Sequence, residues 1–192
     1  MRRTSFTQMH CSIAQALELV GDWWTPLILR DLLLGLHRFE DLTENLGISR
    51  NLLTGRLAQL VESDIVERRL YQDRPPRSEY HLTEAGRELA PVLMALMAWG
   101  DKWATPPGGP PVRLRHDSCG ALFTPRVCCS DCGEPVTAAT VTELPGPGAA
   151  AGPGTALLHR RATAGSADGM DSANGVGSAD SADGVGSADS AD

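Results

Sequence analysis

The sequence predicts a mainly helical fold with one small β-hairpin, an α+β arrangement, and three observations carry that prediction. Apolar residues recur at helical spacing in short stretches up to residue 104. Two strings rich in β-forming residues, 66–72 and 79–82, flank a tip of proline and arginine. Beyond a Pro- and Gly-rich linker at 105–111, large apolar side chains are too few for a second core. We therefore expect one folded unit, residues 11–104, after an N-terminal arm at 1–10.

The first two helices follow from apolar spacing and from residues that cap helices. Apolar side chains at helical spacing place the first helix at residues 11–21, where Ser12 and Gln15 have the spacing of a capping box. Asp22 can cap a second helix, which ends at Gly35. Both helices are short and amphipathic, as expected for elements that cover a small core.

The next stretch has the pattern of two helices joined by a tight turn. A third helix ends at Gly47, where a left-handed residue is needed, and Ser49 caps a fourth. Leu53, Leu57 and Leu60 lie at i, i+4 and i+7 and bury one side of the fourth helix. The β-hairpin follows directly. Helix, turn, helix and hairpin in this order make a winged helix-turn-helix, a unit whose second helix enters the major groove of double-stranded DNA.

Polar and basic side chains lie away from the leucines of the fourth helix and at the hairpin tip. Arg50 can fork onto guanine and Asn51 can pair with adenine, each worth about 1–3 kcal/mol of base discrimination. Gly55 leaves room for DNA backbone, and Arg56 on the flank is placed for phosphate. Prolines keep the tip, residues 73–77, out of the strand ladder, so its arginines can reach phosphate. For each residue taken singly, the alternative is a solvated surface side chain. The predicted DNA-binding residues are Ser49, Arg50, Asn51, Thr54, Gly55, Arg56, Arg74 and Arg77.

A last helical region supplies a surface for a second copy of the chain. It starts after Thr83, and Pro91 should break it near Ala90. The part after the proline carries more apolar side chains than a small domain can cover, so we expect a dimer seam there. Trp23 and Trp24 are expected in the core or in the dimer contact, with stacking on a ligand as the alternative.

Charge and hydropathy exclude several classes of protein. The net charge is −7, but residues 162–192 alone contribute −6, so the folded unit is near neutral. Sixteen of the seventeen basic residues are arginine, which suits phosphate and guanine, although a GC-rich coding bias is the preferred explanation. The apolar stretch LILRDLLLGL is interrupted by Arg30 and Asp31, so we expect no membrane span. We expect a cytoplasmic protein, whose cysteines are reduced, metal-bound or redox-active.

Several of these stretches in combination resemble the HxlR-type family of bacterial helix-turn-helix transcriptional regulators. They are LELVGDWWTPLILRDLLLGLHRFEDL, GISRNLLTGRLAQLVESDIVERR and PPRSEYHLTEAG, with Cys11 ahead of them. The resemblance covers roughly residues 11–104. It implies a winged-helix homodimer in the bacterial nucleoid that binds a palindromic promoter site as a repressor or activator, of which we expect the repressor. Family members commonly respond to oxidants, electrophiles and aldehydes, and the effector itself is not specified by the residues.

Cys11 is a candidate redox sensor on two grounds. The resemblance places it where some members of the family sense through a cysteine. Independently, a helix N-terminus favours the reactive thiolate form of a thiol. The alternative is a small, partly buried residue at a helix start.

Residues 112–144 contain a zinc-ribbon-like pattern. His116 and Cys119 are separated by two residues, and so are Cys129 and Cys132. A glycine follows each pair, which is typical of zinc knuckles, and three thiolates with one imidazole form a common structural zinc site. Cys128 is a possible substitute for its neighbour. A thiol-disulfide redox site and a metal-free remnant are the alternatives.

The remaining features leave two rival functions. Residues 145–192 are a low-complexity acidic tail that ends in two copies of GVGSADSAD, and we expect disorder there. A thiol oxidoreductase using the second cysteine pair would need a βαβ pattern that is missing. No phosphate loop, Ser/His/Asp set or carboxylate pair stands out, so we expect no enzyme. An interaction adaptor that keeps the winged helix as a scaffold is the other rival.

Overall fold

The structure is a computed structural model, which describes residues 5–158 and residue 160. Within that part of the chain, helices come first, a two-stranded antiparallel hairpin follows, and two more helices and a minimal second hairpin complete the order. The elements are α1 (Ser12–Val20), α2 (Thr25–Leu33), α3 (Phe39–Leu46), α4 (Arg50–Glu62), β1 (Val66–Asp73), β2 (Pro76–Leu82), α5 (Glu84–Glu88), α6 (Ala90–Trp103), β3 (Leu114–Arg115) and β4 (Leu122–Phe123).

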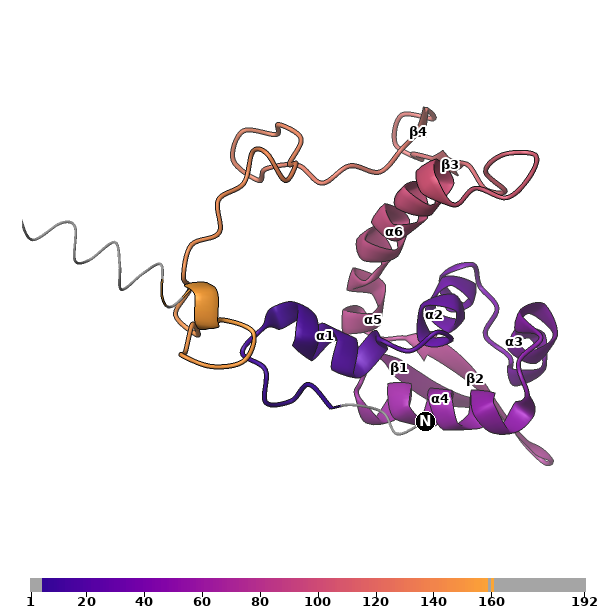
Figure 1. Cartoon of the computed structure of the whole chain (residues 1–192). Coiled ribbons are helices and arrows are strands. Elements are labelled where there is room, and N and C mark those ends of the chain that lie inside the picture. Colours follow the sequence, from indigo (N-terminus) through magenta and orange to yellow (C-terminus); the bar gives the residue numbers. More distant parts are fainter. Residues whose placement is uncertain (1–4, 159, 161–192) are drawn as a thin grey trace, which may run out of the picture.

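The core lies where α2, α3 and α4 meet the base of the β1–β2 hairpin (Figure 1). Each helix contributes the apolar side chains of one face, and the hairpin contributes the residues at its open end. The three leucines of α4 that were predicted to be buried are at most 1% exposed. The buried cluster consists of Ile28, Leu29, Leu32, Leu42, Ile48, Leu53, Leu57, Leu60, Ile65, Val66 and Leu82.

Local signals in the sequence placed most helix ends correctly. Gly47 ends α3 with φ 62°, a left-handed conformation in which glycine is not strained. The Ser49 hydroxyl accepts the backbone N–H of Leu52 at 3.4 Å and so caps α4. Thr83 likewise accepts the N–H of Gly86 at 3.2 Å. These caps are confirmed, and so is the predicted break near Ala90, where α5 gives way to α6.

Three local predictions differ from the structure. α2 begins at Thr25, and Asp22 instead accepts the N–H groups of Trp24 and Thr25, at 2.8 and 3.1 Å. The capping box of Ser12 and Gln15 does not form, because the Gln15 amide donates to carbonyl oxygens of the N-terminal arm. The hairpin tip is shorter than predicted, since Pro76 pairs with Asp73 across the strands. An edge strand accepts proline when the missing N–H would face outward.

The first and last helices leave large apolar surfaces uncovered. α6 rises away from the core and has no buried residue, and α1 buries only Ala14 (Figure 1). Trp24 packs against the core, whereas Trp23 is 92% exposed, so the two neighbouring tryptophans have different environments. The large exposed side chains on these helices are Ile13, Leu17, Leu19, Val92, Leu96, Trp99 and Trp103.

The segments after α6 are held by turns rather than by a core. No residue between 112 and 144 is buried. Residues 146–158 fold back to the start of α1, where the His10 N–H donates to the Pro153 carbonyl oxygen at 3.0 Å. The predicted disorder of the tail is therefore not confirmed for residues 146–158, and the repeats lie outside the described residues. In the part of the chain that is described, no helix is long and apolar enough to cross a membrane.

Candidate nucleic-acid interface

α4 presents its N-terminal half to solvent. Arg50, Asn51, Thr54 and Gly55 are all exposed, away from the buried stripe of Leu53, Leu57 and Leu60. Leu53 is fully buried, which fixes the rotation of the helix about its axis. The predicted base-reading residues therefore share one free face, and a Cβ added at Gly55 would meet nothing within 4 Å.

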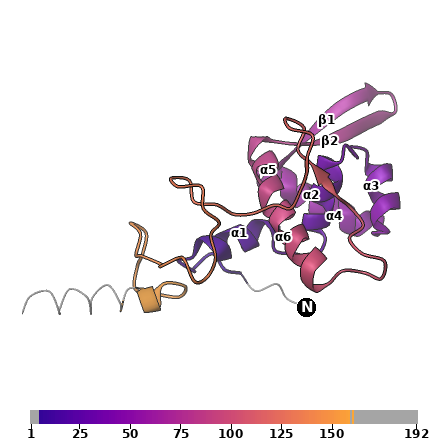
Figure 2. The same ribbon diagram turned by 90° about the horizontal axis from the view of Figure 1, so that it is seen from above.

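The β1–β2 hairpin lies beside this face and encloses a concavity of about 520 Å³ with it. Arg50 and Thr54 line the concavity from α4, and Arg68 and Arg77 line it from the strands. The hairpin extends past the helices as a projecting wing (Figure 2). Three arginines thus line one open hollow. The aromatic and apolar walls are Phe39, Tyr71, Pro75, Pro76 and Tyr80, and Glu40 is the acidic residue among the lining residues.

A β-bulge in β1 determines which residues of the wing line the concavity. Leu70 pairs with Ser78 and Gln72 pairs with Arg77, so Tyr71 is an extra residue on β1. Successive residues of a regular strand alternate between faces, and one extra residue reverses the alternation beyond it. Arg68 and Tyr71 therefore line the same concavity although they are three positions apart. Sequence reasoning missed both residues, because nothing local marks the bulge.

Arg50 makes two weak contacts with residues of α3. Its guanidinium lies 4.8 Å from the Phe39 ring centroid, and its Nη2 is 3.5 Å from a carboxylate oxygen of Glu40. Both side chains of this ion pair are more than half exposed, so the pair is weak and easily exchanged. Arg50 can leave Glu40 for a phosphate or a guanine edge at little cost.

The wing is anchored to α3 by an ion pair and by backbone bonds. Arg38 Nε lies 3.3 Å from a carboxylate oxygen of Glu79, and the Tyr80 N–H donates to the His37 carbonyl at 2.8 Å. The hydrogen bond from Arg38 holds the pKa of Glu79 below its ordinary value and raises the pKa of Arg38. These contacts fix the angle between the wing and the helix-turn-helix, on which the shape of the concavity depends.

Two predicted DNA-binding arginines lie outside the concavity. Arg56 is about a quarter exposed, its Nε is 3.3 Å from Asp22, and its Nη1 donates to Gln59. It thus joins α4 to the segment before α2. Arg74 lies at the exposed hairpin tip, where its carbonyl accepts from Gln72. Arg74 is free to reach along a duplex, whereas Arg56 is engaged within the fold.

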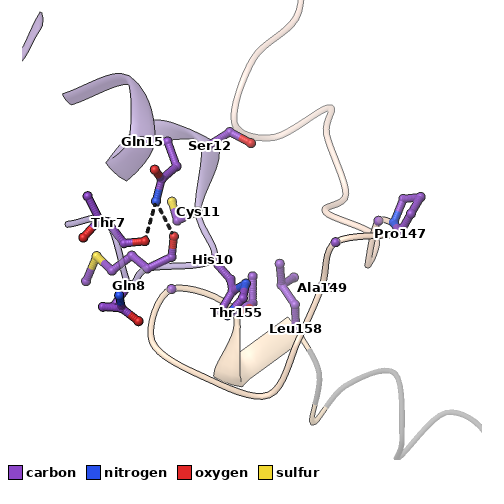
Figure 3. Close-up of a pocket in the computed structure, with 14 residues that line it drawn as sticks. Thr7, Gln8, His10, Cys11, Ser12, Gln15, Pro147, Ala149, Thr155 and Leu158 are labelled. Carbon is purple, nitrogen blue, oxygen red and sulfur yellow. Dashed lines mark hydrogen bonds between the residues drawn. The ribbon is translucent and has the colours of Figure 1, made fainter. Parts of the chain in front are cut away.

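Cys11 lies directly before α1 in a second concavity, of about 850 Å³ (Figure 3). The hollow is formed by residues 7–15 on one side and residues 146–158 on the other. The cover is close, since a Cβ built on Gly154 would lie 2.9 Å from the Cβ of Cys11. Two of the lining residues are joined by a hydrogen bond, in which the Gln15 amide donates to the Met9 carbonyl at 2.8 Å. The thiol is partly exposed and unpaired with another cysteine.

The predicted zinc ligands form two separate pairs. His116 Nδ1 lies 3.4 Å from Cys119 Sγ in one turn. Cys129 and Cys132 share the other turn. Hydrogen bonds from the backbone N–H of Cys132 and, to a smaller extent, of Asp131 lower the pKa of the Cys129 thiol. Within residues 5–158 and 160, no group of three or more His, Cys, Asp or Glu side chains is placed to hold a metal ion.

The sequence profile of HxlR-like helix-turn-helix proteins matches residues 19–107, which contain α2 to α6. An HTH-type transcriptional regulator of Mycobacterium bovis, Mb3122, is 50% identical over 137 residues, which cover 71% of this chain and 87% of that protein. The chain belongs to the HxlR-like helix-turn-helix family. It is a transcriptional regulator of the helix-turn-helix type.

Solved structures share this fold beyond the winged helix. PA1607, described as a candidate transcription factor, is 34% identical with a TM-score of 0.65, over 73% of this chain and 98% of that one. PA1374 of Pseudomonas aeruginosa, described in the same way, is 37% identical with a TM-score of 0.53, over 78% and 99%. The profile match and the Mycobacterium relative confirm the family resemblance drawn from the sequence.

Proposed function

We propose that this HxlR-like regulator binds a palindromic promoter site as a homodimer, acts there as a repressor in the bacterial cytoplasm, and responds to oxidants or electrophiles through Cys11. One observation carries the DNA-binding part. The free face of α4 and the wing together present Arg50, Arg68 and Arg77 to a single hollow. Phosphate contacts position such a protein, and base contacts from the recognition helix give it specificity.

Each side chain has a distinct task in this proposal. Arg50 donates to the O6 and N7 atoms of guanine, and Asn51 pairs with adenine. Arg68, Arg74 and Arg77 neutralise phosphates on the strand beside the wing. The hydroxyl of Thr54 is already bonded to the Arg50 carbonyl at 2.8 Å, which leaves its methyl group for thymine.

The dimer is supported by the uncovered apolar faces of α1 and α6. Monomeric proteins rarely expose contiguous apolar patches of this kind. A two-fold pairing through these faces would bury them and would match the two-fold symmetry of a palindromic site. In such a dimer the half-sites are one helical turn of DNA, about 34 Å, or a multiple of it apart.

Selection of oligonucleotides bound by the full chain, followed by anisotropy titration, tests the proposal. The expected product is an inverted repeat. Arg50→Ala and Asn51→Ala should each reduce the preference for that repeat over random duplex by about tenfold to a hundredfold, the loss of one bidentate contact. Selection of no consensus, or variants with unchanged preference, would contradict it.

The sensing part has its own test, because Cys11 begins the helix that carries part of the dimer surface. Oxidation or alkylation of the thiol would enlarge a side chain that lies between residues 7–15 and residues 146–158, and we expect this to shift the start of α1. Diamide should therefore weaken operator binding by the wild-type chain and leave Cys11→Ser unaffected. Equal loss in both proteins, or loss in neither, would exclude Cys11 as the sensor.

A further inference from the structure

The two cysteine-bearing turns of residues 112–144 are the same turn, built twice. In the first, the Gly120 N–H donates to the His116 carbonyl at 2.7 Å, and the His116 N–H donates to the Ala121 carbonyl at 2.9 Å. In the second, Gly133 donates to Cys129, and Cys129 donates to Glu134, both at 2.9 Å. The two glycines have φ 72° and 75°.

This repeated hydrogen bonding assigns equivalent positions in the two turns. His116 and Cys129 occupy the first position, and Cys119 and Cys132 occupy the fourth. Cys128 lies one residue before the second turn, where it forms a bridge with Pro135. Cys128 is therefore not equivalent to any residue of the first turn that carries a metal-binding side chain.

Within the first turn, the side chains are already spaced as two ligands of one metal ion. Tetrahedral zinc with bonds of about 2.0–2.1 Å to nitrogen and about 2.3 Å to sulfur places those two atoms about 3.5 Å apart. The observed distance from Nδ1 of His116 to Sγ of Cys119 is 3.4 Å.

The segment has no buried core, although Val112, Leu114, Leu122 and Phe123 line shallow hollows beside α6. Its larger apolar side chains remain in contact with solvent, with Leu122 at 57%, Val127 at 62% and Phe123 at 40% exposure. Ordering a residue costs about 1–2 kcal/mol of backbone entropy, which hydrophobic burial ordinarily offsets. A structural zinc site supplies on the order of 10 kcal/mol or more.

The described structure keeps the turns apart, so each is half of a site. Residues 121–128 connect them, and eight residues reach up to about 27 Å when extended. Leu122 and Phe123 in this connection are paired with β3, so the two halves would meet through a change of the backbone at residues 124–127.

We propose that one zinc ion closes these halves into a single tetrahedral site with His116, Cys119, Cys129 and Cys132 as ligands. On binding, the three thiols release their protons to solvent and bond to zinc as thiolates, and the neutral imidazole bonds through Nδ1. The site lies outside the DNA-binding surface and goes beyond the proposed function, so the two ideas fail independently.

Zinc content of the full chain, purified with Zn²⁺ under reducing conditions and desalted, tests the proposal. One zinc per chain is expected, with three of the five thiols protected from a thiol reagent and two, Cys11 and Cys128, reactive. Cys119→Ser and Cys132→Ser should each reduce the zinc content to near zero. Cys11→Ser and Cys128→Ser are matched controls that should keep it.

Other results would overturn the site. These are absence of zinc, retention of zinc in Cys119→Ser, loss of zinc in Cys128→Ser, one zinc shared by two chains, or a disulfide between Cys129 and Cys132 in the purified protein. Replacement by Co²⁺ gives a second readout. The expected spectrum has thiolate charge-transfer and tetrahedral bands, and an octahedral spectrum typical of adventitious surface binding would contradict the proposal. Helical circular dichroism distinguishes loss of metal from loss of the winged-helix fold.

Discussion

The winged-helix unit and residues 112–144 of the same chain are stabilised in different ways. The first unit buries eleven apolar residues in one cluster. The second has regular turns and no buried residue. Both regions obey local rules of turn and cap geometry, but only the first converts that geometry into a packed core. Local hydrogen bonding specifies the shape of a short segment, and burial or metal ligation must supply its stability.

The largest expected effect is on the free energy of unfolding, which should fall much more when an apolar side chain is removed from the winged-helix unit than from residues 112–144. Leu57→Ala removes a side chain that is 1% exposed, and the cavity should reduce the free energy of unfolding by about 3 kcal/mol. Val127→Ala, at 62% exposure, should change it by less than about 0.5 kcal/mol. Urea unfolding followed by helical circular dichroism measures both. A large effect of Val127→Ala would show that residues 112–144 pack on the winged helix.

A buried carboxylate should give the next largest effect. Asp31 is fully buried, accepts the Asn45 amide at 2.7 Å and pairs with Arg30 at 2.6 Å. Asp31→Ala should cost about 2 kcal/mol of unfolding free energy, since it leaves the Asn45 donor without its partner. The exposed Glu44 on the same helix as Asn45 is the control, and Glu44→Ala should be near neutral. Equal effects of the two substitutions would mean that burial of Asp31 is unimportant.

These two regions also show how far the sequence alone could go. Ser49, Gly47 and Thr83 were assigned correctly, because capping depends on neighbours within a few residues. Arg56 was predicted to contact phosphate and Arg68 was given no role, because distant parts of the chain determine the surroundings of both residues. The first depends on Asp22, 34 positions away, and the second on a strand register that only the paired hairpin defines.

The cysteine-bearing turns of residues 112–144 show the same difference between local and long-range information. Spacing alone predicted both turns of residues 112–144, yet it could not predict that Cys128 falls outside the turn pattern. That assignment needed the backbone hydrogen bonds of Cys129. The sequence likewise predicted that both tryptophans after Asp22 lie in the core or a dimer contact, and only Trp24 packs on the core of this chain.

A methyl group added at Gly55 should change stability and DNA affinity in opposite directions. Gly55→Ala adds a Cβ to open space on α4 and should raise the free energy of unfolding by about 1 kcal/mol through helix propensity. The same methyl group would meet DNA backbone in the proposed complex, so operator affinity should fall. Thermal unfolding and anisotropy on one preparation measure both. Unchanged affinity would mean that DNA does not approach Gly55.

The smallest expected effect is a dependence of stability on pH at the base of the wing. Glu79 has a pKa below its ordinary 4.5 because Arg38 donates to its ionised form. Its contribution to stability is therefore present above that ordinary value and is lost as the pH falls through the lowered pKa. Wild type should be slightly more stable than Glu79→Gln at pH 7, and the difference should disappear as the pH falls through the lowered pKa of Glu79. A difference that persists in acid would exclude the ionised pair as its cause.

The salt dependence of operator binding tests the DNA interface most directly, with Arg68 and Arg69 as a matched pair. These neighbours on β1 face opposite sides of the wing, since Arg68 lines the hollow beside α4 and Arg69 lines another hollow beside α2. Arg68→Ala should weaken binding and lower the slope of log affinity against log salt by about one. Arg69→Ala should leave both unchanged. Equal behaviour of the two variants, or a loss confined to Arg69→Ala, would contradict the placement of DNA between α4 and the wing.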